Sequence, residues 1–512
     1  MNFDLYTAGL TLMTAPAFFG MIMGTVVGIV IGALPGLTAM MAVSILVPVT
    51  YSLDPTAGVL MLLGVYCGAN YGGSISATLV NIPGTPSAVM TTLDAYPLAK
   101  QGKAGLAIGI ATMTSTLGGL FSVFTLALFS PLIASIALKF TSLELFSIGL
   151  FGLSVIAYIS PGSTLKGLIS GVIGLMLATI GSDPITAVPR FTFGNMNLFS
   201  GIQFIAAMIG LFGLSEVLMS FEKKSADIQK SEFYEVKDPF ECFKYLKEIW
   251  GNIIRSSIIG TIVGAIPGAG GTIASIVSYA QEKKISKHPE ELGKGSIHGI
   301  TAAEASNNAC TGGAMITLLS LGIPGDAVTA ILIGAFVIHG LTPGPMLFTT
   351  NFDLVSAIFI GMFMINIFIL LLGLFGAKYF ARLMLVPKPI MNTVILILCV
   401  VGTYGVQNSM FDVYTMLIFA VLGYFITKLS LPKAPIVLAL ILGPLMESNL
   451  RRWIELANGD YFGMFFRTSL TNPIALIILM ITAATLLLPF FSKKGRISED
   501  MVGRLKEENS NL

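Results

Sequence analysis

The feature that most restricts the fold of this chain is the length of its uncharged apolar runs. No charged residue occurs between Leu5 and Leu53, and no Lys or Arg precedes Lys100. An apolar run of 18 or more residues is long enough to cross a bilayer as a helix. Across all 512 residues only 11% are charged and 54% are hydrophobic, whereas soluble domains carry about 25% charged residues. The sequence therefore predicts an all-α polytopic membrane protein with about 10–14 transmembrane helices.

Charge and residue usage exclude several function classes. The formal net charge of +2 is too small to indicate a nucleic-acid partner. The four cysteines are widely spaced, which favours buried packing residues over metal ligands. No nucleophile with a base, paired acids or His-rich metal set stands within the apolar runs. We therefore expect no enzymatic activity and no cofactor, and a membrane-embedded enzyme or a passive channel remains a remote alternative.

Composition divides the chain into four parts. We expect a first membrane repeat at 1–220, a polar linker with an amphipathic helix at 221–250, and a second repeat with C-terminal helices at 251–491. A charged tail follows at 492–512. The Lys and Arg density of the linker and the tail favours the cytoplasmic side for both. The short apolar runs at 38–51 and 434–446 are too short to span, so we interpret them as half-helices or re-entrant pieces.

The two membrane regions share one pattern. GIVIGALPG at 28–36 matches GTIVGAIPG at 260–268 with a constant shift of 232 (267 − 35). YGGSISATLVNIPG at 71–84 matches GGAMITLLSLGIPG at 312–325 with a shift of 241 (324 − 83). A lone GxxxG is a common helix-packing motif. Four Pro-Gly breaks, paired in two halves, indicate instead two inverted repeats with broken or re-entrant helices, which is typical of secondary transporters.

Each Pro-Gly break leaves backbone groups bare at membrane depth, where only protein or a water-filled cavity can satisfy them. At NIPGTPS (81–87), we expect one half-helix to end and a second, about 85–99, to start. That second half-helix would present free N–H groups at Thr85, Ser87 and Ala88. Asp326 and Ala327 would begin the matching element in the second half.

The lysine and arginine map limits what these breaks can bind. No Lys or Arg lies between Met1 and Ala99, and none lies between Lys294 and Lys378. A bound anion would be held by helix N-termini, backbone amides and polar side chains. Na⁺ could bind among the freed carbonyls, and the two interpretations are compatible. For each polar side chain, interhelical hydrogen bonding is the alternative.

Glu304 is an acid early in an apolar helix, which makes it a functional candidate by default. Its alternative is an interfacial acid stabilised by the helix dipole. Asp94 and Lys100 are interpreted as interfacial rather than as ligands.

Several long motifs together resemble the large permease subunit of the tripartite tricarboxylate transporter family. They are GALPG, YGGSISATLVNIPGTPSAVMTTLDAYPLAKQGKAG, GAIPGAGGTIASIVSY and AAEASNNACTGGAMITLLSLGIPGDAVTAILIGAF, in the family's order from about residue 15 to 450. The chain departs from the family locally at Asp94-Ala95-Tyr96, where Asp-Gly is common. The resemblance implies a bacterial or archaeal inner-membrane transporter of citrate and related carboxylates, coupled to Na⁺ or H⁺. Its partners would be a small four-helix membrane subunit and a periplasmic solute-binding protein.

The residue patterns and the resemblance together give the predicted site. The expected substrate-binding residues are Pro35, Gly36, Asn70, Gly72, Ser74, Asn81, Pro83, Gly84, Thr85, Ser87, Pro267, Gly268, Gly270, Asn307, Asn308, Thr311, Gly313, Pro324 and Gly325, and the possible Na⁺ ligands are Asn81, Glu304 and Asn308. The expected mechanism is alternating access, with either an elevator-like or a rocking motion. A stand-alone transporter of small organic anions, without partner subunits, is the alternative.

Overall fold

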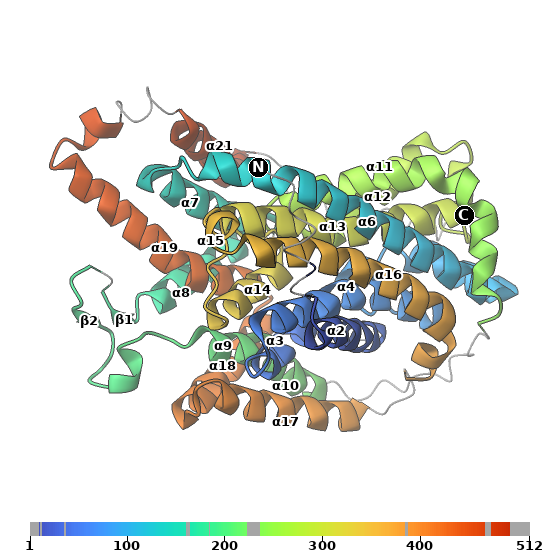
Figure 1. The fold of residues 1–512 in the computed structure, drawn as a ribbon, viewed down its shortest axis with the longest axis horizontal. Coiled ribbons are helices and arrows are strands. Elements are labelled where there is room, and N and C mark those ends of the chain that lie inside the picture. Colours follow the sequence, from blue (N-terminus) through green and yellow to red (C-terminus); the bar gives the residue numbers. More distant parts are fainter. Residues whose placement is uncertain are drawn as a thin grey trace.

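The computed structural model describes residues 10, 13–34, 37–159, 164–183, 185–222, 236–383, 388–465 and 473–491. This part of the chain is almost entirely helical (Figure 1). Within it, eight helices are long and apolar enough to cross a membrane, and five shorter apolar helices accompany them. The prediction of an all-α polytopic membrane protein is confirmed. The number of full crossings, about 10–14, stays a prediction.

The helices follow one another through the two membrane regions. The first region contains α2 (Ala15–Ala33), α3 (Ala39–Thr50), α4 (Pro55–Val80), η1 (Pro86–Ala88), α5 (Thr92–Leu98), η2 (Ala99–Lys103), α6 (Ala104–Ala137), α7 (Ser142–Ile159), α8 (Thr164–Ala178), η3 (Met196–Leu198), α9 (Phe204–Met208), η4 (Ile209–Leu214) and α10 (Ser215–Glu222). The second contains η5 (Pro239–Tyr245), α11 (Leu246–Ala265), α12 (Gly270–Ile285), η6 (Pro289–Glu291), α13 (Ile297–Leu321), α14 (Ala327–Ile338), α15 (Leu347–Thr350), α16 (Phe352–Leu383), α17 (Lys388–Gln407), α18 (Met410–Lys428), α19 (Ala434–Ala457) and α21 (Ile474–Phe491).

The two short apolar runs have different outcomes. The first forms the 12-residue helix α3, so it is short as predicted. The interpretation of 434–446 as a half-helix is wrong, because α19 continues for 24 residues through Pro444 and a polar last section. An apolar run indicates which part of a helix can contact lipid. The helix itself can continue through the polar residues that follow.

Only part of the predicted linker falls within the described residues, because 223–235 lie outside them, as does the predicted tail at 492–512. After this gap η5 leads directly into α11, which begins at Leu246. The four-part division of the chain and the cytoplasmic side of the linker and tail stay predictions.

The two most enclosed helices are α4 and α13, which belong to different halves. Every residue from 62 to 79 in α4 and from 299 to 320 in α13 is buried. Both helices carry many polar residues, so they are not lipid-facing helices but the interior around which the others pack. The candidate site lies where these two helices meet.

Glycine seams join α2 to α4 and α11 to α13 in the same way. A Cβ on Gly28 would lie 2.5 Å from the Val65 carbonyl oxygen, and one on Gly260 would lie 2.2 Å from that of Ser306. Gly28 and Gly260 differ by 232 (260 − 28), and Val65 and Ser306 by 241 (306 − 65). These are the shifts of the two sequence blocks, so the repeat is reproduced in three dimensions. The inverted sense of the repeats stays a prediction.

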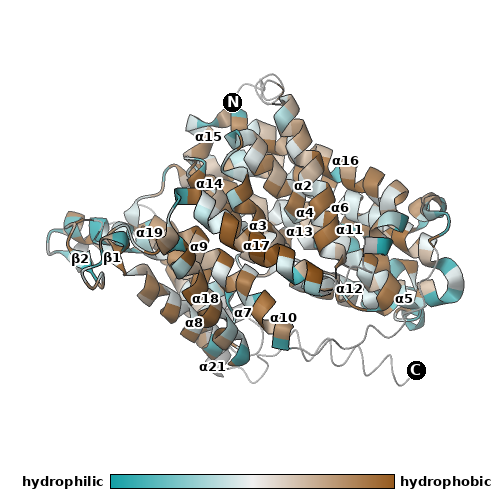
Figure 2. Cartoon of the chain, turned by 90° about the horizontal axis from the view of Figure 1, so that it is seen from below, coloured by the Kyte–Doolittle hydropathy of each residue, from teal (hydrophilic) through white to brown (hydrophobic). Residues whose placement is uncertain are grey.

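A small two-stranded feature lies at one end of the molecule. The strands β1 (Gly181–Ser182) and β2 (Pro189–Arg190) pair antiparallel there, and Asp183 contacts Arg451 of α19 at 2.7 Å. Backbone N–H groups of Thr186 and Ile185, together with Arg451, hold the pKa of Asp183 well below its ordinary range. In both views the strands lie at the end opposite to α12, with hydrophobic helices between them (Figure 2).

Candidate functional site

The predicted helix breaks are present in both halves. Helix α4 ends at Val80, and Asn81 caps it in the left-handed conformation with φ 56°. Helix α13 ends at Leu321, and Gly322 caps it in the same conformation with φ 72°. Asn81 and Gly322 are related by the shift of 241 (322 − 81). Each half therefore ends its central helix with the same backbone turn before the IPG sequence.

Each IPG tip packs on the other break of its own half. A Cβ on Gly84 would lie 1.9 Å from the Gly32 carbonyl oxygen, and one on Gly325 would lie 2.4 Å from that of Gly264. The Gly268 N–H donates to the Gly325 carbonyl oxygen at 2.7 Å. Only glycine fits at these close approaches, which explains the Gly of each motif. Pro35 and Gly36, also predicted for the site, lie outside the described residues.

The tips also reach across to the opposite half. The Ser87 Cβ lies 3.0 Å from the position of a Cβ on Gly271, at the start of α12. In return, the Tyr66 hydroxyl of α4 donates to Asp326 Oδ2, at the second tip, at 2.5 Å. The first broken segment therefore contacts the break of the second half, and the second broken segment contacts the central helix α4 of the first half.

The central helices contact each other at the same level. Asn307 Nδ2 of α13 donates to the Asn70 carbonyl oxygen of α4 at 3.4 Å. Cys67 Sγ lies 3.8 Å from Thr311 Oγ1. The Asn307 Oδ1 atom is buried and has no hydrogen-bond partner within the described part of the chain. Asn70, Asn307 and Thr311 were all predicted for the site, and the fold brings them together.

The predicted half-helix at 85–99 is wrong in its form. Pro86–Ala88 forms a single 3-10 turn, and a regular helix resumes only at Thr92. Tertiary contacts hold the intervening chain in a bend, because the Thr91 hydroxyl donates to Glu304 of α13. Thr85 Oγ1 and Ser87 Oγ remain buried and lie 3.0 Å apart.

The second tip does form a helix, but its N-terminus is occupied by its own side chain. Asp326 Oδ1 accepts from the Thr329 N–H at 2.7 Å, and Thr329 Oγ1 accepts from the Asp326 N–H at 2.9 Å. This reciprocal capping uses two of the N–H donors at the helix start. The start of α14 therefore carries a carboxylate, which would repel an anion.

Glu304 is fully buried between three segments of the chain. Its carboxylate accepts from Thr91 and, at 2.8 Å, from Ser115 of α6. Asn308 Nδ2 donates to the Glu304 carbonyl oxygen at 3.3 Å. Glu304 is therefore enclosed by protein, with hydroxyl groups as the side-chain partners of its carboxylate within the described residues. Its depth in the membrane stays a prediction.

Asp94, which we interpreted as interfacial, is also enclosed by protein. Asp94 is fully buried, and its Oδ1 accepts from the N–H groups of Gly293, Gly295 and Ser296 at 2.8 to 3.0 Å. Tyr279 donates to its Oδ2 at 2.7 Å. Asp94 therefore fastens the chain after the first tip to the loop before α13. Lys100 is exposed, 5.7 Å above the Tyr96 ring.

Several other predicted site residues have packing or local roles. Cβ atoms on Gly72 and Gly313 would lie 2.4 Å from the Ile29 carbonyl oxygen and 2.2 Å from that of Thr261. The Ser74 hydroxyl donates to the Tyr71 carbonyl oxygen within α4. Asn81 is exposed at the end of α4 and stands apart from the buried cluster. Pro267 and Pro324 are buried in their breaks, and Pro83 is half-buried.

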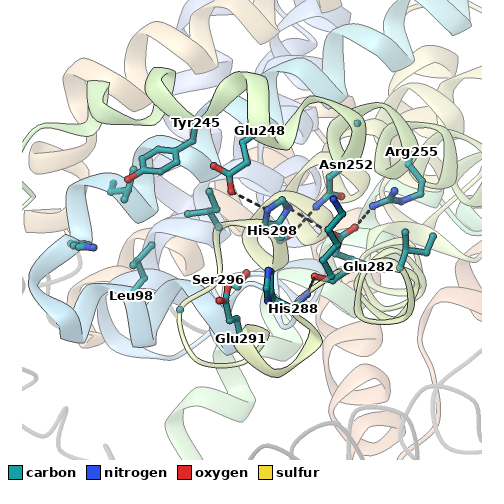
Figure 3. A pocket seen from close by; sticks show the side chains of 18 of the residues that line it. Leu98, Tyr245, Glu248, Asn252, Arg255, Glu282, His288, Glu291, Ser296 and His298 are labelled. Carbon is teal, nitrogen blue, oxygen red and sulfur yellow. Dashed lines mark hydrogen bonds and ion pairs between the residues drawn. The ribbon is translucent and has the colours of Figure 1, made fainter.

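A cavity of about 650 Å³ lies at the other end of α12 (Figure 3). Arg255 forms an ion pair with Glu282 beside it, and His298 lies 3.3 Å from Glu248. The lining carries three cations (Lys103, Arg255, Lys287) and three carboxylates (Glu248, Glu282, Glu291). Because these charges balance when the histidines are neutral, the cavity offers no net attraction for a polyanion.

Sequence reasoning missed Tyr66, Gly271 and the Asp94 anchor. Tyr66 carries a detectable signal, because the shift of 241 pairs it with Asn307 (307 − 66). The hydrogen bonds of Asp94 join residues that are about 200 positions apart in the sequence, and no local sequence pattern predicts such contacts. Within the described residues, no group of three or more His, Cys, Asp or Glu could hold a metal ion.

Comparisons with known proteins extend over most of the chain. The family model described as "Tripartite tricarboxylate transporter TctA family" matches residues 18–438. The "Uncharacterized 52.8 kDa protein in TAR-I ttuC' 3'region" of Agrobacterium vitis is 36% identical over 467 residues, which are 91% of each chain. The "Uncharacterized protein in TAR-II ttuC' 3'region" of the same organism is 36% identical over 220 residues, 43% of this chain and 89% of that one. No solved structure matches the chain.

Proposed function

Because the chain belongs to the tripartite tricarboxylate transporter TctA family, we propose that it imports tricarboxylates or related carboxylates by cation-coupled alternating access. As the large subunit it would work with a small four-helix membrane subunit and a periplasmic solute-binding protein. The membrane would be a bacterial or archaeal inner membrane, with the C-terminus in the cytoplasm.

One observation supports transport at the helix breaks in particular. Two repeat-related tips each contact the opposite half, through Ser87 with Gly271 and through Asp326 with Tyr66. A site built between repeats can open to one side or the other when the repeats move relative to each other. The motion would be elevator-like or rocking.

The coupling cation, Na⁺ in this proposal and H⁺ in its variant, would be bound near the Glu304 carboxylate. Glu304 and Asn308 lie on one face of α13 and are both buried. Asn81, the third predicted ligand, has an exposed side chain at a helix end, so the proposal depends on Glu304 and Asn308. Replacing Glu304 with Gln should raise the Na⁺ concentration for half-maximal uptake by about tenfold, the loss of one charged ligand interaction. The exposed Glu290→Gln variant is the control.

The proposal is tested by uptake into proteoliposomes that contain both membrane subunits, with the solute-binding protein added outside. Radiolabelled citrate should accumulate above its equilibrium level only under an inward Na⁺ gradient, and a Na⁺ ionophore should abolish accumulation. Equilibration without a gradient would indicate a passive channel. Equal accumulation without the two partner proteins would indicate a stand-alone transporter.

A further inference from the structure

Four new segments begin after the four helix breaks, and three of them are either a single turn or a helix with a side-chain cap on its first turn. In α3 the Thr38 hydroxyl accepts from the Met41 N–H at 3.2 Å. In α14 the Asp326 carboxylate accepts from the Thr329 N–H. The turn η1 has only three residues, so it has no helix dipole of consequence. The remaining segment is α12.

Helix α12 differs because nothing caps it. It has 16 residues, and Ala269 before it provides no side-chain hydrogen bond. The N–H groups of Gly270 to Ile273 donate to no carbonyl outside the helix within the described part of the chain. These four residues are half-buried, so protein does not fully enclose them. Free N–H groups and the positive end of the dipole together suit an anion.

A second, independent feature stands at the same place. Asn307 Oδ1 is buried without a partner within the described residues, and it lies 2.6 Å from the position of a Cβ on Gly271. Ser87 Cβ lies 3.0 Å from that position. The missing side chain of Gly271 thus lets the α12 backbone approach the Asn307 amide and the Ser87 side chain closely. A half-turn of the Asn307 carboxamide, which releases its bond to the Asn70 carbonyl oxygen, would present its N–H donors to the start of α12.

We propose that a carboxylate group of the transported anion binds at the start of α12. The N–H groups of Gly271 and Thr272 donate to it, and the Ser87 hydroxyl and the Asn307 amide complete the shell. This inference rests on the proposed function and assigns its anion site to one helix end. No Lys or Arg is required, in agreement with their absence from both IPG segments.

The side chain of Asp326 lies at one side of the proposed anion site. Its Cβ lies 3.6 Å from the position of a Cβ on Gly270, the first residue of α12. The carboxylate accepts from Thr329 and Tyr66 and forms no ion pair within the described residues. A second carboxylate of the cargo near Asp326 would be repelled unless a cation lay between them. The arrangement thus gives a physical reason for cation-dependent binding.

The test measures binding of citrate, as the tricarboxylate probe, to the purified membrane complex by saturation binding of radiolabel. Gly271→Ala places a Cβ 2.6 Å from Asn307 Oδ1, and Ser87→Ala removes one hydroxyl donor. Each should weaken citrate binding by about tenfold or more. Asn307→Asp places a carboxylate beside Gly271 and should weaken citrate binding further through like-charge repulsion. Gly251→Ala on α11, where a Cβ meets nothing within 4 Å, is the matched control and should bind as the unmodified protein does.

The outcomes separate this inference from the proposed function. If the unmodified complex binds and transports citrate while Ser87→Ala and Asn307→Asp bind it equally well, the α12 site is wrong and the transport function stands. If the unmodified complex neither binds nor transports any tricarboxylate tested, both proposals fail. Ser87→Ala is a small change that keeps the test valid should Gly271→Ala fail to fold, which a size-exclusion profile shows.

Discussion

Asn81 and Gly322 occupy the same left-handed position at the ends of α4 and α13, with φ 56° and 72°. Glycine adopts this conformation without cost, and Asn is the side chain that tolerates it best among the others. The left-handed backbone conformation therefore explains why Asn stands at position 81, without any role in binding a ligand.

We expect Asn81→Gly to retain Na⁺-dependent uptake, because its repeat partner is already glycine. Asn81→Ala should lower the free energy of unfolding by about 1 kcal/mol, since Ala is strained at positive φ. The measurement is thermal unfolding in detergent together with the Na⁺ dependence of uptake. If both variants lose Na⁺ affinity to the same extent, the Asn81 side chain is a ligand and not a cap.

At the residue scale, the sequence predicted which polar residues would lie near the breaks better than it predicted how they are arranged. Thr85, Ser87 and Asn307 come together as expected. Whether an amide oxygen such as Asn307 Oδ1 finds a partner depends on helices brought together from both halves. The burial of Asp94 depends likewise on a loop about 200 residues away. Such outcomes are tertiary, so no motif of a few residues could reveal them.

The glycine seams are the element-scale feature that sets how closely the central helices approach. A Cβ on Gly24 of α2 would lie 2.0 Å from the Met61 carbonyl oxygen of α4. A Cβ on Gly260 of α11 would meet the Ser306 carbonyl oxygen at 2.2 Å. Both distances are far below a permitted contact, so the helices must separate to admit even one methyl group.

Gly24→Ala and Gly260→Ala should each destabilise the protein by about 1 to 3 kcal/mol, the usual range for overpacking. The check is the thermal midpoint of the detergent-solubilised protein. Gly405→Ala on α17 is the control, because its Cβ meets nothing within 4 Å. Midpoints equal to that of the control would show that the seams are not close contacts.

Helix starts were harder to predict than helix ends at this scale. Pro-Gly located all four breaks, because proline and glycine act on the backbone wherever they stand. The conformation of the chain after a break depends instead on capping and on neighbouring helices. Thr91 is held by Glu304, so the first tip does not form the expected half-helix, whereas α14 begins at Ala327 after Asp326 as expected, with a side-chain cap on its first turn.

On the scale of the whole molecule, the two polar ends are separated by the hydrophobic helices. The β1–β2 segment lies at one end, and the C-terminal part of α12 lies at the other (Figure 2). Lysines are concentrated near the second end, in α12 and the loop after it. The positive-inside rule predicts that this end faces the cytoplasm.

Single cysteines should report this orientation in intact cells. The four native cysteines are all buried, so they give little background. A membrane-impermeant maleimide should label Phe193→Cys, at a residue 88% exposed near β2, and should not label the exposed Lys284→Cys until the membrane is permeabilised. The reverse pattern would invert the orientation.

The central claim is that the cargo binds where the two repeats meet, against the start of α12. The most direct measurement is a structure of the membrane complex determined with a bound tricarboxylate. The account predicts ligand density in contact with the backbone of Gly271 and the side chains of Ser87 and Asn307. Density confined to the 650 Å³ cavity beside Arg255 and His298 would contradict it.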